Sequence, residues 1–145
     1  MRRIDVAIAV VCRLGQVLIC RRKADDRFGG FWEFPGGKVE DGETPGQCLA
    51  REVREELDIE VELIRALPII EHDYPDIRVR LYPFLCIHEA GQPKPIGCQQ
   101  AIWVDPPDLR NYQFPPANRQ LIEDVVAYLL AGRQLRANED TDRSD

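Results

Sequence analysis

Three glutamates on one predicted helix face are the clearest chemical signature in this chain. Glu52, Glu55 and Glu56 are spaced i, i+3 and i+4, so a helix would bring them together. Three like charges in that arrangement repel one another, and a solvated acidic face is the ordinary explanation of such a stripe. A hard cation would turn the repulsion into binding, because Mg²⁺ prefers oxygen ligands from carboxylates and substrate phosphates.

A glycine loop directly upstream favours the cation over the solvated face. Pro35, Gly36, Gly37 and Lys38 follow an apolar stretch, and glycine lets backbone groups approach a ligand closely. A lysine beside a carboxylate cluster suits an anion that shares the metal with the carboxylates. Together the loop and the acidic stripe predict metal-assisted chemistry on a phosphate ester or anhydride.

A helix that runs to about Leu57 is expected to present these carboxylates. Thr44 and Gln47 form the pattern of a capping box, and Pro45 stands at the first helical position, where proline is favoured. The apolar side chains that share one helix face, and so should pack on the core, are Leu49, Val53 and Leu57.

The run from Gly37 to Ile59 resembles the Nudix box, Gx5Ex7REUxEExGU, in which U is an aliphatic residue. Every defined position matches except one, where Asp58 replaces the last glycine. That glycine follows the helix, where a left-handed residue is often needed, and aspartate tolerates this conformation better than most residues. The resemblance implies an α+β fold of the Nudix type, an α/β/α sandwich with a mixed sheet between helices.

The Nudix resemblance also implies a metal site and a set of catalytic residues. Mg²⁺, for which Mn²⁺ can substitute, would be the cofactor. Glu52 is the candidate general base, Arg51 would pair with Glu43 or Glu52, and Lys38 would stabilise charge on the leaving phosphate. The implied metal ligands are the Gly36 carbonyl and the carboxylates of Glu52, Glu55 and Glu56.

Similarity to the MutT-like group of this superfamily extends over most of residues 4–130. The segments with similar order and spacing are 21–22, 32–38, 74–76, Trp103 and 114–118. The resemblance implies hydrolysis of 8-oxo-dGTP or a related purine triphosphate at the β-phosphorus, which releases the nucleoside monophosphate and pyrophosphate. The implied substrate-binding residues are Arg22, Arg27, Glu33, Phe34, Pro35, Gly36 and Asn118.

Two features leave the choice of substrate open. Asn118 could read a purine edge with its amide, or it could cap the last helix. The MutT-like group has a further glutamate before the tryptophan, whereas residues 97–100 here are Gly-Cys-Gln-Gln, of which Gln99 or Gln100 could offer a neutral oxygen. The alternatives are a Nudix hydrolase for another diphosphate (CTP, dCTP or a nucleoside diphosphate sugar) and a non-catalytic Nudix-like recognition module.

The rest of the chain predicts strands before and after the acidic helix. Strands are expected at residues 4–12, 17–22, 31–34, 59–71, 77–88 and 101–104. Pro83 suggests an edge strand or a bulge. A second helix is expected from about Asn118 to Ala131 and should end at Gly132. Residues 1–132 would form a single domain, and the polar tail 133–145 would be disordered.

Composition limits the partners of the chain. A net charge of -6 over 145 residues argues against a nucleic-acid polymer, because such binding depends on basic patches. The five cysteines lack CxxC spacing and should be small buried hydrophobes in a reducing compartment. No stretch is apolar and long enough for a membrane span. We expect a cytoplasmic monomer or homodimer, without a membrane partner, that binds a nucleoside triphosphate.

Overall fold

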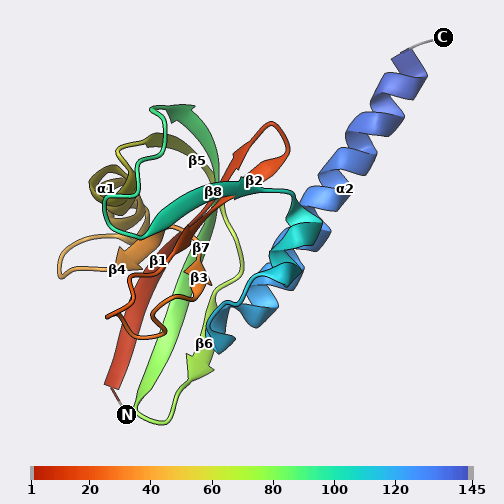
Figure 1. Ribbon diagram of the computed structural model, residues 1–145. Coiled ribbons are helices and arrows are strands. Elements are labelled where there is room, and N and C mark those ends of the chain that lie inside the picture. The colour runs from red at the N-terminus through yellow and green to blue at the C-terminus, as the bar shows by residue number, and fades with distance from the viewer. Residues whose placement is uncertain (1, 144–145) are drawn as a thin grey trace.

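The computed structural model describes residues 2–143, and side chains as far as Gly132 (Figure 1). Its strands are β1 (Arg2–Arg13), β2 (Gln16–Arg21), β3 (Trp32–Glu33), β4 (Gly36–Lys38), β5 (Glu60–Ala66), β6 (Ile70–Asp73), β7 (Ile77–Ala90) and β8 (Gln100–Val104). Its helices are α1 (Pro45–Leu57), the 3-10 turns η1 (Pro106–Asn111) and η2 (Pro116–Asn118), and α2 (Arg119–Arg143). All six predicted strand regions contain strand, and β4 was expected only as a glycine loop.

The eight strands form one mixed sheet with β1 at its centre. The strand order is β3-β2-β1-β7-β5, while β4 pairs with β1, β6 with β7, and β8 with β2. β1 runs parallel to β7 and antiparallel to β2 and β4. Helices α1 and α2 lie on opposite sides of this sheet (Figure 1). The predicted α+β sandwich with a mixed sheet between helices is therefore confirmed.

Alternation along β1 builds a separate core on each face of the sheet. Ile8 and Val10 pack with residues of α2, and Ala7, Ala9 and Val11 pack with residues of α1. All five are 5% exposed or less, as expected for a strand that is covered on both faces. The acidic helix is thus fixed to the sheet by its apolar face, as the sequence predicts.

The segment 59–71 was expected to be one strand, but it is interrupted. β5 and β6 are separate, and residues 67–69 between them bend away from regular pairing. Pro83 lies opposite this break, where its carbonyl accepts a hydrogen bond from the Leu67 N–H at 2.8 Å. The expectation of an edge position is wrong, because β7 pairs with β1 on one side and with β5 and β6 on the other. The interruption explains why an interior strand tolerates a proline there.

Helix α2 is longer than its sequence pattern predicts. It begins at Arg119 and continues through Gly132 to Arg143, so the predicted end at Gly132 is wrong. Gly132 lacks the left-handed φ that stops a helix, and the residues after it include good helix formers such as Gln, Leu, Arg and Ala. The tail expected to be disordered from residue 133 is helical as far as Arg143, and residues 144–145 lie outside the described residues.

Two further expectations concern features of the whole chain. Four of the five cysteines are buried and the fifth is partly buried, all as free thiols, in line with their predicted role as small hydrophobes. Within residues 2–143, no helix is apolar and long enough to cross a membrane. The single-domain division at residue 132 stays a prediction.

Candidate active site

Helix α1 begins and ends where its sequence signals predict. The Thr44 hydroxyl accepts a hydrogen bond from the Gln47 N–H at 3.2 Å, and the Gln47 side-chain oxygen accepts one from the Thr44 N–H at 2.9 Å. At the other end Asp58 has φ 54°, and its N–H donates to the Arg54 carbonyl. Asp58 therefore takes the left-handed conformation that glycine supplies in the Nudix box.

The carboxylate of Glu52 rests directly on the glycine loop. A Cβ placed on Gly37 would lie 2.4 Å from Glu52 Cδ and 2.7 Å from each carboxylate oxygen. Only a residue without a side chain permits this approach. The loop is itself fixed, since the Pro35 carbonyl accepts a bond from the Ala9 N–H of β1 at 2.8 Å. Pro35 is buried behind the site and does not line the cleft, so the structure gives no support to its predicted substrate contact.

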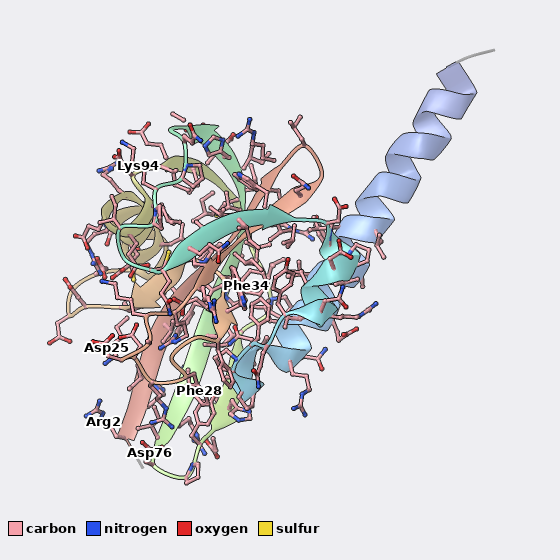
Figure 2. The ribbon with its side chains drawn as sticks, viewed as in Figure 1. Arg2, Asp25, Phe28, Phe34, Asp76 and Lys94 are labelled. Carbon is pink, nitrogen blue, oxygen red and sulfur yellow. The ribbon has the colours of Figure 1, made fainter. Side chains whose placement is uncertain are left out.

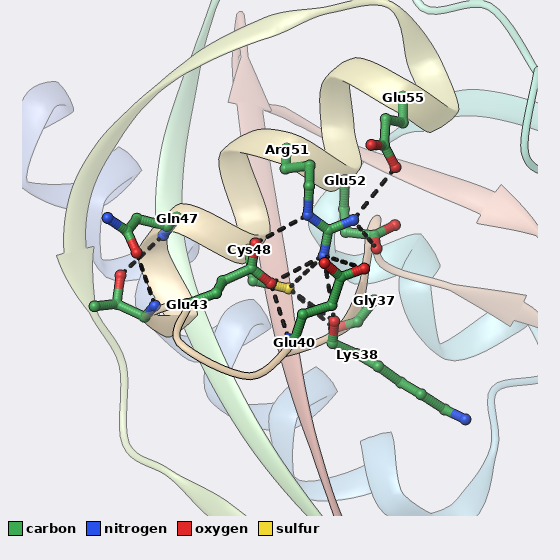
Figure 3. A network of polar contacts seen from close by, with 10 residues as sticks. Gly37, Lys38, Glu40, Glu43, Gln47, Cys48, Arg51, Glu52 and Glu55 are labelled. Carbon is green, nitrogen blue, oxygen red and sulfur yellow. Dashed lines mark hydrogen bonds and ion pairs between the residues drawn. The ribbon is translucent and has the colours of Figure 1, made fainter.

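Arg51 connects the glycine loop, the turn that precedes α1, and the acidic face of α1 (Figure 3). Its Nε and Nη2 donate to the two oxygens of Glu43 at 2.9 Å each, and its Nη1 donates to Glu52 Oε1 at 2.9 Å. The hydrogen bonds from Arg51 lower the pKa of Glu43 to about 2, so Glu43 stays ionised. The sequence predicted a bond to Glu43 or Glu52, and the structure shows both.

The three glutamates of the predicted metal set are neighbours on α1 but differ in exposure. Glu55 Oε2 accepts from Arg51 Nη1 at 3.3 Å, and the Glu55 side chain is 61% exposed, against 14% for Glu52. Glu52 and Glu55 thus share one Arg51 nitrogen, Nη1, and the place of Glu55 in the metal set stays a prediction. Among the described side chains, which end at Gly132, no group of three or more His, Cys, Asp or Glu is arranged to hold a metal without further movement.

Among the carboxyl groups of this site, Glu56 has the most strongly raised pKa. Burial, together with the negative charges of Glu52 and Glu33, raises the pKa of Glu56 to about 9. Burial also raises the pKa of Glu33, against the opposing effect of Arg22. Carboxyl groups crowded in this way keep a proton at neutral pH unless a cation joins them, and a bound divalent ion reverses that preference. The donor set of Glu52 and Glu56 beside the Gly36–Gly37 backbone therefore fits a divalent cation such as Mg²⁺.

The predicted substrate residues other than Pro35 meet in one cleft of about 760 Å³. It extends from the α1 site to the end of the sheet where Phe28 and Asp76 lie (Figure 2). Lys38 also lines this cleft, and its side chain extends away from the Arg51 network (Figure 3). The predicted site residues along its wall are Arg22, Arg27, Glu33, Phe34, Gly36, Lys38, Glu56 and Asn118.

Asn118 presents an unpaired amide to this cleft. Its side chain is buried, at 8% exposure, and makes no hydrogen bond with any described residue, so it does not cap α2. The backbone beside it is held in place, because the Ala117 N–H donates to the Tyr74 hydroxyl at 3.0 Å. Of the two roles that the sequence left open for Asn118, the geometry favours contact with a ligand.

The other predicted base contacts are largely engaged within the protein. Phe34 is 3% exposed, and its ring packs against that of Phe114, so it offers little stacking surface. Arg22 Nη1 donates to Glu33 Oε2 at 2.5 Å. Arg27 donates to both oxygens of Asp76, at 2.7 and 2.8 Å. Arg27 thus bridges the mouth of the cleft instead of pointing freely into it.

No carboxylate replaces the glutamate that the MutT-like pattern places before Trp103. Gly97 lines the cleft in that region, and its backbone lies against the Glu56 side chain. The Gln99 side-chain nitrogen donates to the Arg22 carbonyl at 2.7 Å, and Gln100 is an exposed residue of β8. The neutral oxygens that the sequence suggested from these glutamines are not among the groups that line the cleft.

Cys48 supports the site in a way that the sequence analysis missed. Its thiol lies within hydrogen-bonding distance of the carbonyls of Gly37 and Lys38, at 3.4 and 3.3 Å. Cys48 stands four residues before Glu52 in α1, on the helix face that packs against the glycine loop. Because residues i and i+4 share a helix face, this spacing could have predicted that Cys48 lies beside the site. The thiol stays protonated, because burial raises the pKa of Cys48 to about 12.

Comparisons with known proteins agree with the box and the fold. The family model for the NUDIX domain matches residues 6–124. The chain is 32% identical to a protein of Escherichia coli K12 named 8-oxo-dGTP diphosphatase, over 84% of this chain and 95% of that one. It is also 32% identical to the CTP pyrophosphohydrolase of the same strain, over 88% of this chain and 94% of that one.

A solved structure supports the same assignment. A MutT structure, from work on Aliivibrio salmonicida and Vibrio cholerae, superposes with a TM-score of 0.72 at 34% identity. The match covers 88% of this chain and 98% of that chain. The chain belongs to the NUDIX family and, within it, to the MutT-like group.

Proposed function

We propose that this protein hydrolyses a purine nucleoside triphosphate, with 8-oxo-dGTP as its substrate, to the nucleoside monophosphate and pyrophosphate. The relative named 8-oxo-dGTP diphosphatase supports this substrate, since the match spans nearly all of both chains. The intact Arg51 network supports an enzyme over a recognition module, because a module that only binds has no use for an oriented carboxylate.

The observation that carries the choice of base is the Asn118 amide. The amide has no hydrogen-bond partner among the described side chains, and its polar atoms remain accessible from the cleft, so a ligand can bond to them. An amide can both donate and accept, which suits a purine edge that carries a carbonyl beside an N–H. Oxidation at C8 of guanine adds such a pair, O8 beside N7–H, to the one that guanine already carries in O6 beside N1–H.

Glu52, Glu55 and Glu56, with the Gly36 carbonyl, would hold Mg²⁺, for which Mn²⁺ can substitute. When bound, the ion would neutralise the triphosphate charge and polarise the phosphorus under attack. Arg51 orients Glu52 by holding its Oε1, and Glu52 would take a proton from the attacking water. Lys38, on the cleft wall, would stabilise charge on the departing pyrophosphate.

CTP is the second candidate, because the relative named CTP pyrophosphohydrolase matches this chain at the same identity. The test compares kcat/KM for 8-oxo-dGTP, dGTP, CTP and ADP-ribose, with pyrophosphate release as the readout. We expect 8-oxo-dGTP to lead the series. Equal values across the panel would remove the oxidised-guanine assignment, and a lead for CTP would replace it.

Two variants sharpen this experiment. Loss of a hydrogen bond between the enzyme and the base costs about 1–3 kcal/mol. Asn118→Ala should therefore lower kcat/KM for 8-oxo-dGTP by roughly 5- to 150-fold. Asn111→Ala is the matched control, since Asn111 is exposed in η1 and is not among the residues that line the cleft. If no nucleotide yields pyrophosphate and Glu52→Gln changes nothing, the enzyme assignment itself fails.

We also propose that the protein acts in the cytoplasm as a monomer or homodimer. Light scattering of the purified chain distinguishes these two states and would expose a larger assembly.

A further inference from the structure

Residues 91–97 form a strap over the C-terminal end of α1. The N–H of Lys94 donates to the Leu57 carbonyl at 2.9 Å, and the N–H groups of Ile96 and Gly97 donate to the Glu56 carbonyl at 3.1 and 3.0 Å. The last carbonyls of a helix have no partner inside the helix, so they need donors from elsewhere. This strap supplies them directly behind the Glu56 side chain.

The strap is held at two further points. Lys94 Nζ lies 3.1 Å from Asp58 Oδ2, beside the end of α1 (Figure 2). Gly91 has φ +87°, and a Cβ there would lie 2.6 Å from the Asp58 carbonyl oxygen. The Gly91 carbonyl is in turn 2.5 Å from His88 Nε2. Because both ends are tied down, the strap cannot move aside easily to make room for a side chain.

At Gly97 the strap backbone forms a wall for the Glu56 side chain. A Cβ on Gly97 would lie 2.7 Å from Cγ, 2.9 Å from Cβ and 3.1 Å from Cδ of Glu56. Both residues line the cleft. The methylene part of Glu56 is thus confined between its own helix and a bare piece of backbone, and this fixes where its carboxylate enters the cleft.

We propose that Gly97 is a positioning residue for Glu56. By contact through its backbone, it holds the Glu56 carboxylate in the orientation that binds the divalent cation. In the MutT-like pattern the segment before Trp103 contributes a glutamate of its own to the site. In this chain the same segment contributes the Gly97 backbone, which orders Glu56. This inference rests on the proposed function for its effect on hydrolysis, but its effect on cation binding can be measured without substrate.

Gly97→Ala is the primary test, with Mn²⁺ binding by electron paramagnetic resonance and kcat/KM as separate readouts. Groups that orient a metal ligand typically change affinity by about 10- to 100-fold when they are altered, and we expect a weakening in that range for Mn²⁺. Gly132→Ala is the matched control, because a Cβ there meets nothing within 4 Å. It should bind Mn²⁺ as the wild type does.

Gly97→Glu is the sharper variant, since it installs the residue type that the MutT-like pattern has. If the wall is what matters, this change should weaken Mn²⁺ binding at least as much as Gly97→Ala does. An affinity at or above that of the wild type would overturn the proposal, because the added carboxylate would then simply act as a ligand.

A double-mutant cycle with Glu56→Ala separates positioning from a general loss of structure. Truncation at Glu56 removes Cγ and Cδ, two of the three atoms that a Gly97 side chain would meet, so Gly97→Ala/Glu56→Ala should fold even if Gly97→Ala does not. In the Glu56→Ala background, the second change should alter Mn²⁺ affinity less than twofold. An equal loss in both backgrounds would show that Gly97 acts independently of Glu56.

The two proposals fail in different ways. If Gly97→Ala weakens Mn²⁺ binding but no nucleotide is hydrolysed by the wild type, the proposed function fails and the positioning role stands. If the wild type hydrolyses nucleotides and Gly97→Ala binds Mn²⁺ normally, the positioning role fails alone.

Discussion

Replacing Glu56 with glutamine should stabilise the metal-free protein at alkaline pH. Burial, with the charges of Glu52 and Glu33, raises the pKa of Glu56 to about 9 from the ordinary 4.5. The native state then binds this proton more tightly than the unfolded chain does. Its favourable contribution is complete below pH 4.5 and is lost as the pH rises toward 9. Glutamine has no proton to lose and should remove this pH dependence.

The size of the effect follows from proton linkage. Each pH unit between the two pKa values changes stability by about 1.4 kcal/mol, so the interval from pH 5 to pH 8 has a ceiling of about 4 kcal/mol. Glu56 lines an open cleft, where water and small movements of the chain reduce the cost of ionisation. We therefore expect Glu56→Gln to exceed the wild type in free energy of unfolding by about 1–2 kcal/mol at pH 8.

Urea unfolding in the presence of a chelator, at several pH values from 5 to 8.5, measures this difference. Glu55→Gln is the control, because Glu55 is the neighbouring glutamate of α1 and its side chain is 61% exposed. Its pH dependence should follow that of the wild type. Saturating Mg²⁺ should restore wild-type stability at pH 8 and have less effect on Glu56→Gln. Parallel pH profiles for the wild type and Glu56→Gln would refute the reasoning.

Three shorter predictions concern other parts of the molecule. Gly37→Ala should abolish turnover while the protein stays folded by circular dichroism, because the new Cβ would lie 2.4 Å from Glu52 Cδ. Arg27→Ala should raise KM several-fold with little change in kcat or in the unfolding midpoint. If the two hydrogen bonds between Arg27 and Asp76 order this end of the cleft, the exchange Arg27→Asp/Asp76→Arg should return KM toward the wild-type value. Gly132→Ala should stabilise α2 by roughly 0.5–1 kcal/mol in urea unfolding, because it replaces a helical glycine where space is open.

Local signals in the sequence were enough to predict α1 and its ends. Thr44, Pro45 and Gln47 act within one turn of each other, so their pattern depends on nothing distant in the fold. The left-handed conformation of Asp58 followed from the same local logic. Family resemblance then supplied the layered fold and the residues that the cleft brings together.

Tertiary contacts explain what the sequence could not show. The helical spacing places Glu55 beside Glu52 and Glu56, but it does not report that one Arg51 nitrogen donates to both Glu52 and Glu55. Pro83 is tolerated in an interior strand only because the neighbouring chain breaks opposite it. The use of Gly97 as a wall for Glu56 joins segments about forty residues apart, and no periodicity reports such a contact.

The parallel pairing of β1 with β7 has a consequence for how the chain folds as it is synthesised. The register joins Arg2 to Ile77 and Cys12 to Ile87, so the central strand waits for its main partner until more than half of the chain has left the ribosome. During that interval the edge of β1 that later pairs with β7 is open, and such β-prone edges associate readily with copies of themselves. Closing so long a loop is slow. We therefore expect the yield of native protein to depend on chaperones and on growth temperature.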